Sequence, residues 1–139
     1  MRDVSKLTLI GIGAGTVLAM SLIIMYCLTG NMAFYLLFNV DYIPVLKELK
    51  PTILIEIAFH YIFCIASVVI LYYLLRMVRL EQRVIVYFIV YTGGSAILFY
   101  LTSFSSHAPF STDLAAWSYW TIGHAIYSVI VGLWIKKWM

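Results

Sequence analysis

Four long apolar runs constrain this chain more than any other feature of its sequence. They cover residues 7–29, 51–75, 84–104 and about 115–135. Each holds about 20 residues or more, which at about 1.5 Å per residue is enough to cross a hydrocarbon core about 30 Å thick. Strands of a membrane barrel alternate in polarity and these runs do not, so helices must satisfy the backbone in lipid. We therefore expect an all-α fold, a bundle of four transmembrane helices forming a single integral membrane domain over residues 1–139.

The composition excludes two other classes of protein. Hydrophobic residues make up 64% of the chain and charged residues 11%, with a mean hydropathy of +1.00. That leaves too little polar surface for a small soluble domain and too little charge for a disordered chain. Cys27 and Cys64 both lie inside apolar runs, so we expect them to act as small hydrophobic residues rather than as a disulfide framework. The net charge of +3 is small and predicts no nucleic-acid partner.

The distribution of lysine and arginine predicts the orientation of the chain. With the N-terminus inside, the short inner segments carry seven basic residues and the outer segments carry two. This positive-inside bias places both termini in the cytoplasm and predicts a multi-pass protein of the inner, cytoplasmic membrane. The inner set is Arg2, Lys6, Arg76, Arg79, Arg83, Lys136 and Lys137, and the outer set is Lys47 and Lys50.

The first apolar run carries small residues at helical spacing. It is longer than the apolar part of a cleavable signal, and no small-residue cleavage site follows, so we interpret it as the first span. Gly11, Gly15 and Ala19 form a stripe that allows a second helix to approach closely. The segment 30–50 that follows is too short for another crossing and return. It is expected to be a short helix in the membrane interface or an extension of the first helix.

Three ionisable residues inside the apolar runs are the strongest functional signal. Glu56 and His60 lie four residues apart, and therefore on one side of the second helix, while His124 lies in the fourth helix. Counting from the outer ends at about 1.5 Å per residue, both histidines fall about 14 Å deep and Glu56 about 8 Å deep. Ionisable groups at such depth are costly and need a partner or a purpose.

Polar stripes on neighbouring helices predict where these residues meet. The third and fourth runs present small or polar side chains at the depth of the histidines, so in a four-helix bundle the stripes would converge. We expect an outward-opening pocket with two residues of the last outer loop, His107 and Asp113, at its mouth. The residues expected to ring the pocket are Glu56, His60, Ser95, Thr121 and His124.

Several chemistries are compatible with this pocket. Glu56, His60 and His124 offer the oxygen and nitrogen ligands of a divalent metal site, and a Glu–His pair can exchange protons near neutral pH. Haem ligation is disfavoured because few histidines are present. A hydrolase is also disfavoured, because serines near His107 and Asp113 lack a recognised nucleophile motif. The alternative leaves the polar residues as a hydrogen-bonded packing network, without catalysis.

In that alternative the protein is a structural or regulatory partner in the bilayer. It would act through helix contacts on the face of Gly11, Gly15 and Ala19, with another membrane protein or with a second copy of itself. The basic segment between the second and third runs would face anionic headgroups.

Short motifs in three places resemble small four-span bacterial inner-membrane proteins of the YagU type. They are Glu56-Ile-Ala-Phe-His60 in the second run, Pro109 after the third run, and Gly123-His124 followed by Gly132 in the fourth. The resemblance extends to the layout of most of the chain, but the first outer segment lacks the proline-rich stretch expected of that family. It implies an inner-membrane protein whose family has no assigned biochemical activity.

Overall fold

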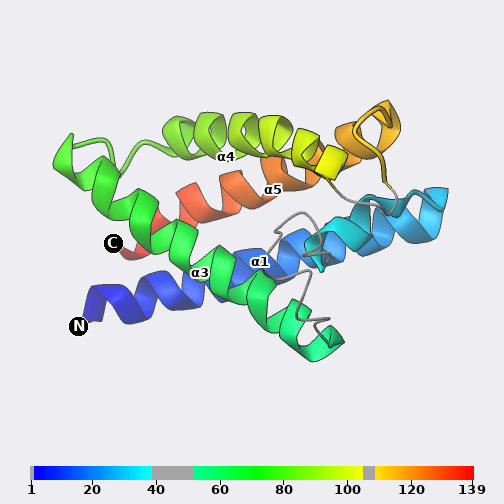
Figure 1. Ribbon diagram of the computed structural model, residues 1–139. Coiled ribbons are helices and arrows are strands. Elements are labelled where there is room, and N and C mark those ends of the chain that lie inside the picture. Colours follow the sequence, from blue (N-terminus) through cyan, green and yellow to red (C-terminus); the bar gives the residue numbers. More distant parts are fainter. Residues whose placement is uncertain (1, 39–51, 105–108) are drawn as a thin grey trace.

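The computed structural model describes residues 2–38, 52–104 and 109–139, and all regular structure within them is helical (Figure 1). The predicted all-α class is therefore confirmed for these residues. In chain order the elements are the α-helix α1 (Arg2–Thr29), the 3-10 helix η1 (Met32–Leu37), the α-helices α3 (Ile53–Met77) and α4 (Val84–Leu98), the 3-10 helix η2 (Phe99–Phe104), and the α-helix α5 (Leu114–Trp138).

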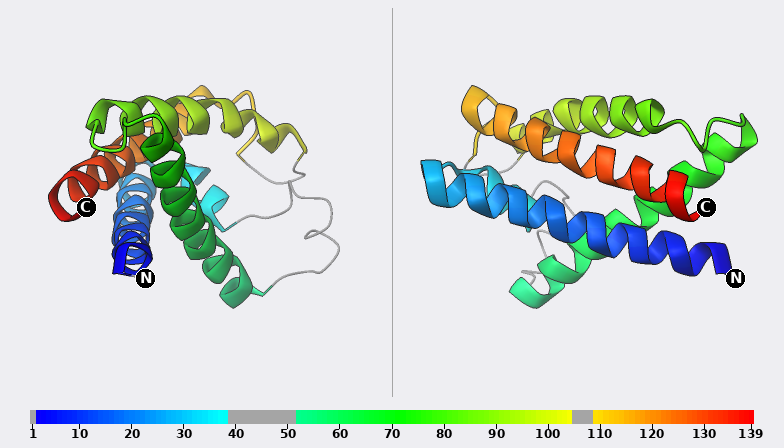
Figure 2. Two further views of the ribbon diagram at one scale, coloured as in Figure 1. Left: turned by 90° about the vertical axis from the view of Figure 1, so that its left-hand side faces the viewer. Right: turned by 180° about the vertical axis from the view of Figure 1, so that it is seen from behind.

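The four α-helices form a row in which α1 and α5 are central. Helix α1 packs against α3 on one side and α5 on the other, and α5 packs in turn against α4. Helix α3 crosses α1 obliquely, while α1, α5 and α4 run side by side (Figures 1 and 2). The central helices carry half of the buried hydrophobic side chains, among them Leu7, Ile10 and Leu18 of α1 and Val131 and Ile135 of α5.

Three of the helical segments are long and apolar enough to cross a membrane. They are Asp3–Thr29, Ile53–Met77 and Val84–Phe104. Helix α5 has the same length as α3, 25 residues, but is not among them. Its N-terminal half contains tryptophan, serine, threonine and histidine, which lower its mean hydropathy. The fourth span expected over about 115–135 is therefore a helix whose crossing of the membrane stays a prediction.

The helix ends differ from the edges of the apolar runs. Helix α1 begins at Arg2 because polar residues can continue a helix beyond the part that suits lipid, and it ends where Gly30 adopts a φ of +69°. The third run, expected as one span, is an α-helix followed by 3-10 turns. In the outer segment the short helix is η1, while residues 39–51 lie outside the described part of the chain.

Glycines set the distances between helices in the row. A Cβ atom added to Gly11 would lie 2.7 Å from the Ile65 Cα atom, and one added to Gly15 would lie 3.0 Å from the Cys64 sulfur. On the other side of α1, Gly123 of α5 would place a Cβ 3.2 Å from Leu22. Such spacing indicates helix backbones in close contact, as small residues allow in membrane proteins.

Both chain ends lie at the same end of the molecule as the α3–α4 connection. Figure 2 shows this from two directions, with the N- and C-terminal turns beside each other. The connection begins at Arg79, which has a left-handed φ of 59° and whose backbone N–H bonds to the Arg76 carbonyl. Lys6, Arg76, Arg79, Arg83, Lys136 and Lys137 therefore gather at this end.

Candidate functional site

His60 is buried where α3 crosses α1. Its Nε2 atom lies 3.3 Å from the carbonyl oxygen of Gly15. Because a carbonyl only accepts, this hydrogen bond places the ring proton on Nε2 and leaves Nδ1 as the lone-pair nitrogen. The rings of Phe38 from η1 and Tyr61 from α3 meet the imidazole edge to face, with centroids 5.7 and 5.1 Å away. The missing Cβ of Gly15 leaves room for the Cys64 side chain, whose sulfur would lie 3.0 Å from it, and so allows α3 to approach α1 closely here.

His124 is half-buried in the middle of α5. Its Nδ1 atom donates to the carbonyl oxygen of Trp120, one turn earlier, at 2.8 Å, so here Nε2 is the lone-pair nitrogen. The Trp120 ring lies over the imidazole with a centroid distance of 4.2 Å. Each histidine therefore uses one ring nitrogen on a backbone carbonyl and keeps the other as an acceptor.

The two histidines lie beside the same part of α1. His60 contacts Gly15, while Gly123, the neighbour of His124, packs against Leu18 and Leu22. Those α1 residues are three and seven positions beyond Gly15, or about 5–10 Å along the helix. The depth of the two histidines in a membrane stays a prediction.

Polar groups from three helices connect these positions. The Cys64 sulfur lies 3.9 Å from the His60 ring nitrogens. The Tyr127 hydroxyl, from α5, donates to the Cys64 carbonyl at 3.4 Å and lies 3.4 Å from the Ser67 hydroxyl. We refer to the following six residues as the interior polar cluster: His60, Cys64 and Ser67 of α3, Tyr91 of α4, and His124 and Tyr127 of α5.

Tyr91 holds the one hydroxyl of this cluster that lacks a hydrogen bond within the described residues. Its ring meets that of Tyr127 edge to face, with centroids 5.1 Å apart, and the Ser67 hydroxyl lies near it. The Tyr91 oxygen is nevertheless buried and makes no hydrogen bond to the described part of the chain. A buried hydroxyl without a partner costs about 1–3 kcal/mol, so this one retains capacity to donate or accept.

The metal hypothesis gains no support from this arrangement. Glu56 is half-buried in the first turn of α3, one turn before His60. Among residues 2–38, 52–104 and 109–139, no group of three or more His, Cys, Asp or Glu side chains is placed to hold a metal ion. Glu56, His60 and His124 are all described, so the structure does not assemble them into such a ligand set.

Ser95 and Thr121 use their hydroxyls within their own helices. Ser95 donates to the Thr92 carbonyl at 3.0 Å, and Thr121 donates to the Trp117 carbonyl at 2.7 Å. What joins α4 to α5 here is a pair of indoles. Trp120 donates to the Ser95 carbonyl at 3.1 Å and Trp117 donates to the Ala96 carbonyl at 3.0 Å. Both carbonyls belong to the last turn of α4, and that of Ser95 is shared, because it also accepts a hydrogen bond from the Phe99 amide.

Of the two residues expected at the pocket mouth, the structure describes only one. His107 lies outside the described residues. Asp113 is the N-cap of α5, and its side chain accepts a hydrogen bond from the Ala116 amide at 2.9 Å. The structure thus gives Asp113 a helix-capping contact.

The small-residue stripe of α1 faces inside the molecule. Gly11 and Gly15 lie against α3, and Ala19 is partly buried against the core. This face is covered by α3 and is not available to a partner protein. Cys27 and Cys64 are both free thiols.

Two contacts of the cluster were missed by the sequence reasoning. Tyr127 lies three residues after His124, and a tyrosine in an apolar helix next to a serine was the available signal. The Gly15 carbonyl had no signal, because every residue has a carbonyl and only the crossing of α1 and α3 selects this one.

Comparisons of the chain with protein-family models, with curated proteins and with solved structures gave no match. The resemblance to YagU-type proteins therefore stays a prediction.

Proposed function

We propose that the chain crosses the cytoplasmic membrane four times, with α5 as the fourth span and both termini in the cytoplasm. Helix α5 lies between α1 and α4, so much of its surface contacts protein instead of lipid. Its polar groups have local partners: the two indoles bond to α4, and Ser118, Thr121 and Ser128 donate to carbonyls of α5 itself. Charges occur only at its two ends, Asp113 and Lys136–Lys137. A helix packed in this way can span lipid with a modest hydropathy.

Within this arrangement, the interior polar cluster serves as a proton-binding site, and the protein responds to pH. The observation that carries this proposal is the pair of imidazoles in one cluster, each with a nitrogen that keeps its lone pair. Histidine is the side chain whose charge changes most readily near neutral pH, since imidazole in water has a pKa of about 6.5. Ionisable groups inside membrane bundles commonly belong to proton pathways.

The surroundings of the histidines determine what proton uptake does. His60 faces Gly15 of α1, Phe38 of η1, and Tyr61 and Cys64 of its own helix. His124 faces Trp120 and Tyr127. The contacts named here are a carbonyl, aromatic rings and a thiol, and an added positive charge among them is poorly solvated. Protonation therefore loosens the contacts of α3 with α1 and α5, which gives proton binding a structural consequence.

The test is a thermal melt in neutral detergent at about pH 8 and about pH 5, on either side of the imidazole pKa of about 6.5. The unfolded chain binds more protons than the cluster does, so stability falls as the pH is lowered. We expect wild type to lose several degrees of melting temperature at the lower pH. In His60→Gln/His124→Gln this loss disappears, because glutamine can still donate an N–H but does not titrate.

His107→Gln is the matched control, because it removes the third histidine and changes no residue of the interior polar cluster. It should keep the pH response of wild type. A response that persists in the double variant, or that disappears in His107→Gln, would contradict the proton site.

A second candidate function is supported by the same hydrogen bonds. Both histidines already donate to backbone carbonyls, so the cluster could serve only to hold α3 against α1 and α5. The protein would then be a structural membrane partner without a titrating site. This candidate is favoured if wild type has the same melting temperature at both pH values and the glutamine variants melt at a much lower temperature than wild type.

A further inference from the structure

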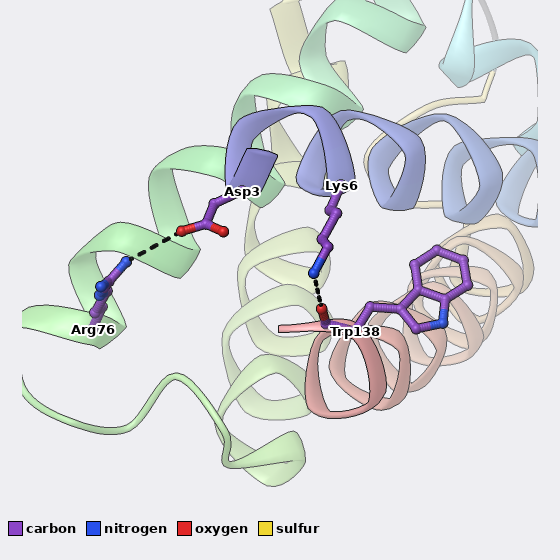
Figure 3. A network of polar contacts seen from close by, with 4 residues as sticks. All are labelled: Asp3, Lys6, Arg76 and Trp138. Atoms are coloured by element: carbon purple, nitrogen blue, oxygen red, sulfur yellow. Dashed lines mark hydrogen bonds and ion pairs between the residues drawn. The ribbon is translucent and has the colours of Figure 1, made fainter. Parts of the chain in front are cut away.

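A network of polar contacts fastens three helix ends at the terminal end of the molecule. Arg76, in the last turn of α3, pairs with Asp3 of α1 at 3.8 Å, and Lys6 of α1 donates to the Trp138 carbonyl of α5 at 2.7 Å. Figure 3 shows both contacts side by side. The ends of α1, α3 and α5 are therefore held together, and the α3–α4 connection and the last turn of α5, both of which carry basic residues, lie at this same end.

Four of those basic residues are exposed and remain uncompensated. We define the basic patch as Arg79, Arg83, Lys136 and Lys137. Within the described residues the Arg76–Asp3 contact is the sole ion pair, so no carboxylate pairs with the patch. Glu81, between the two arginines, has a buried carboxylate oxygen without a hydrogen bond in the described chain.

Apolar and aromatic side chains border the basic patch. Met77 and Val78, which precede Arg79, are 81% and 61% exposed, although they end a helix long and apolar enough to span a membrane. Trp134 and Trp138 stack with centroids 5.3 Å apart, next to the two lysines. Aromatic side chains of this kind anchor helices at the level of lipid headgroups. The basic patch is thus at the height of a phosphate layer.

The geometry points to a binding surface for anionic phospholipid headgroups, formed by the basic patch. A headgroup phosphate supplies the negative charge that the patch lacks, and its acyl chains lie along the exposed apolar residues of α3 and α5. This inference rests on the four-span arrangement proposed above, and not on protonation of the histidines. Each basic residue near a charged lipid surface contributes about fivefold to binding. Four such residues therefore give a clear preference for anionic over zwitterionic lipid.

The experiment titrates phosphatidylglycerol or phosphatidylcholine into the detergent-solubilised protein and follows the melting temperature. We expect the lipid concentration that gives half of the increase in melting temperature of wild type to be at least tenfold lower for phosphatidylglycerol than for phosphatidylcholine. The preference is lost in Arg79→Gln/Arg83→Gln/Lys136→Gln/Lys137→Gln. It is kept in Arg79→Lys/Arg83→Lys/Lys136→Arg/Lys137→Arg, which is matched in position and preserves charge.

Three further measurements make the outcome decisive. Raising the salt from about 0.1 M to about 1 M should abolish the preference in wild type, so the inference is testable even if the glutamine variant fails to fold. Inorganic phosphate alone should not reproduce the shift. His60→Gln/His124→Gln should retain the preference, which separates this site from the proton site. Any of three outcomes would overturn the inference. The two lipids could have equal effects on wild type, or inorganic phosphate could have the same effect as phosphatidylglycerol. The third is a preference for phosphatidylglycerol that survives high salt or the glutamine variant.

Discussion

At the scale of single residues, the interior of this protein depends on backbone atoms as much as on side chains. The His60 imidazole bonds to a carbonyl of α1 at a crossing where Gly15 leaves room for the Cys64 side chain. The indoles of Trp117 and Trp120 likewise bond to carbonyls in the last turn of α4. Interhelical hydrogen bonds of this kind typically contribute about 1 kcal/mol or less each. Several together specify which helix faces meet.

The closest approach of α1 and α3 gives a direct prediction for Gly11. A Cβ at this position would lie 2.7 Å from the Ile65 Cα, a backbone atom that cannot turn aside. Gly11→Ala should therefore separate the two helices and destabilise the protein by about 1–3 kcal/mol, as overpacking does. The measurement is the free energy of unfolding in mixed detergent micelles.

Gly93→Ala is the control for this prediction. Gly93 is an exposed residue away from the ends of α4, and no atom lies within 4 Å of a Cβ built on it. This substitution should be neutral or stabilise by up to about 1 kcal/mol, since alanine is the better helix former. Equal effects of the two substitutions would show that α1 and α3 are not in backbone contact.

At the scale of elements, hydropathy locates the helices but not their ends. The run beginning at Leu7 continues to Arg2 in the structure, because hydropathy reports compatibility with lipid and says little about where a helix starts. The break of the third run at Phe99 was not predicted, since its residues Phe99–Phe104 contain no proline or glycine that would signal the end of an α-helix. The 3-10 helix Met32–Leu37 corresponds to only part of the short helix expected in the outer segment.

The N-terminus of α5 gives a prediction at this scale. The Asp113 side chain caps the helix through the Ala116 amide, so Asp113→Ala should cost about 1 kcal/mol of unfolding free energy. Asp113→Asn should keep most of that stability, because the amide oxygen can accept the same bond. Thr52→Ala serves as the control: Thr52 is the N-cap of α3 but makes no side-chain cap bond, so its loss should have little effect. A large loss in Asp113→Asn would mean that the charge, and not the cap, is what matters there.

At the scale of the whole molecule, the order of the helices could not be predicted. One stripe of small residues and three of small or polar residues are compatible with several arrangements of four helices. The row found here puts α1, and not α4, between α3 and α5. The Tyr127 hydroxyl of α5 nevertheless reaches the Cys64 carbonyl of α3, which brings Tyr127 into one cluster with His60, while Ser95 and Thr121 bond within their own helices. The gathering of the basic residues was predictable in outline, because it follows from counting lysine and arginine along the chain.

The crossing of the membrane by α5 is the claim on which the cluster and the basic patch both depend. It is tested most directly by single cysteines in a Cys27→Ser/Cys64→Ala background, labelled in intact cells with a membrane-impermeant maleimide. The positions are Gln82, Thr112 and Lys137, all exposed in the structure. The account predicts labelling of Thr112→Cys from outside, and labelling of Gln82→Cys and Lys137→Cys only after the membrane is permeabilised. Labelling of Lys137→Cys in intact cells together with Thr112→Cys would contradict it.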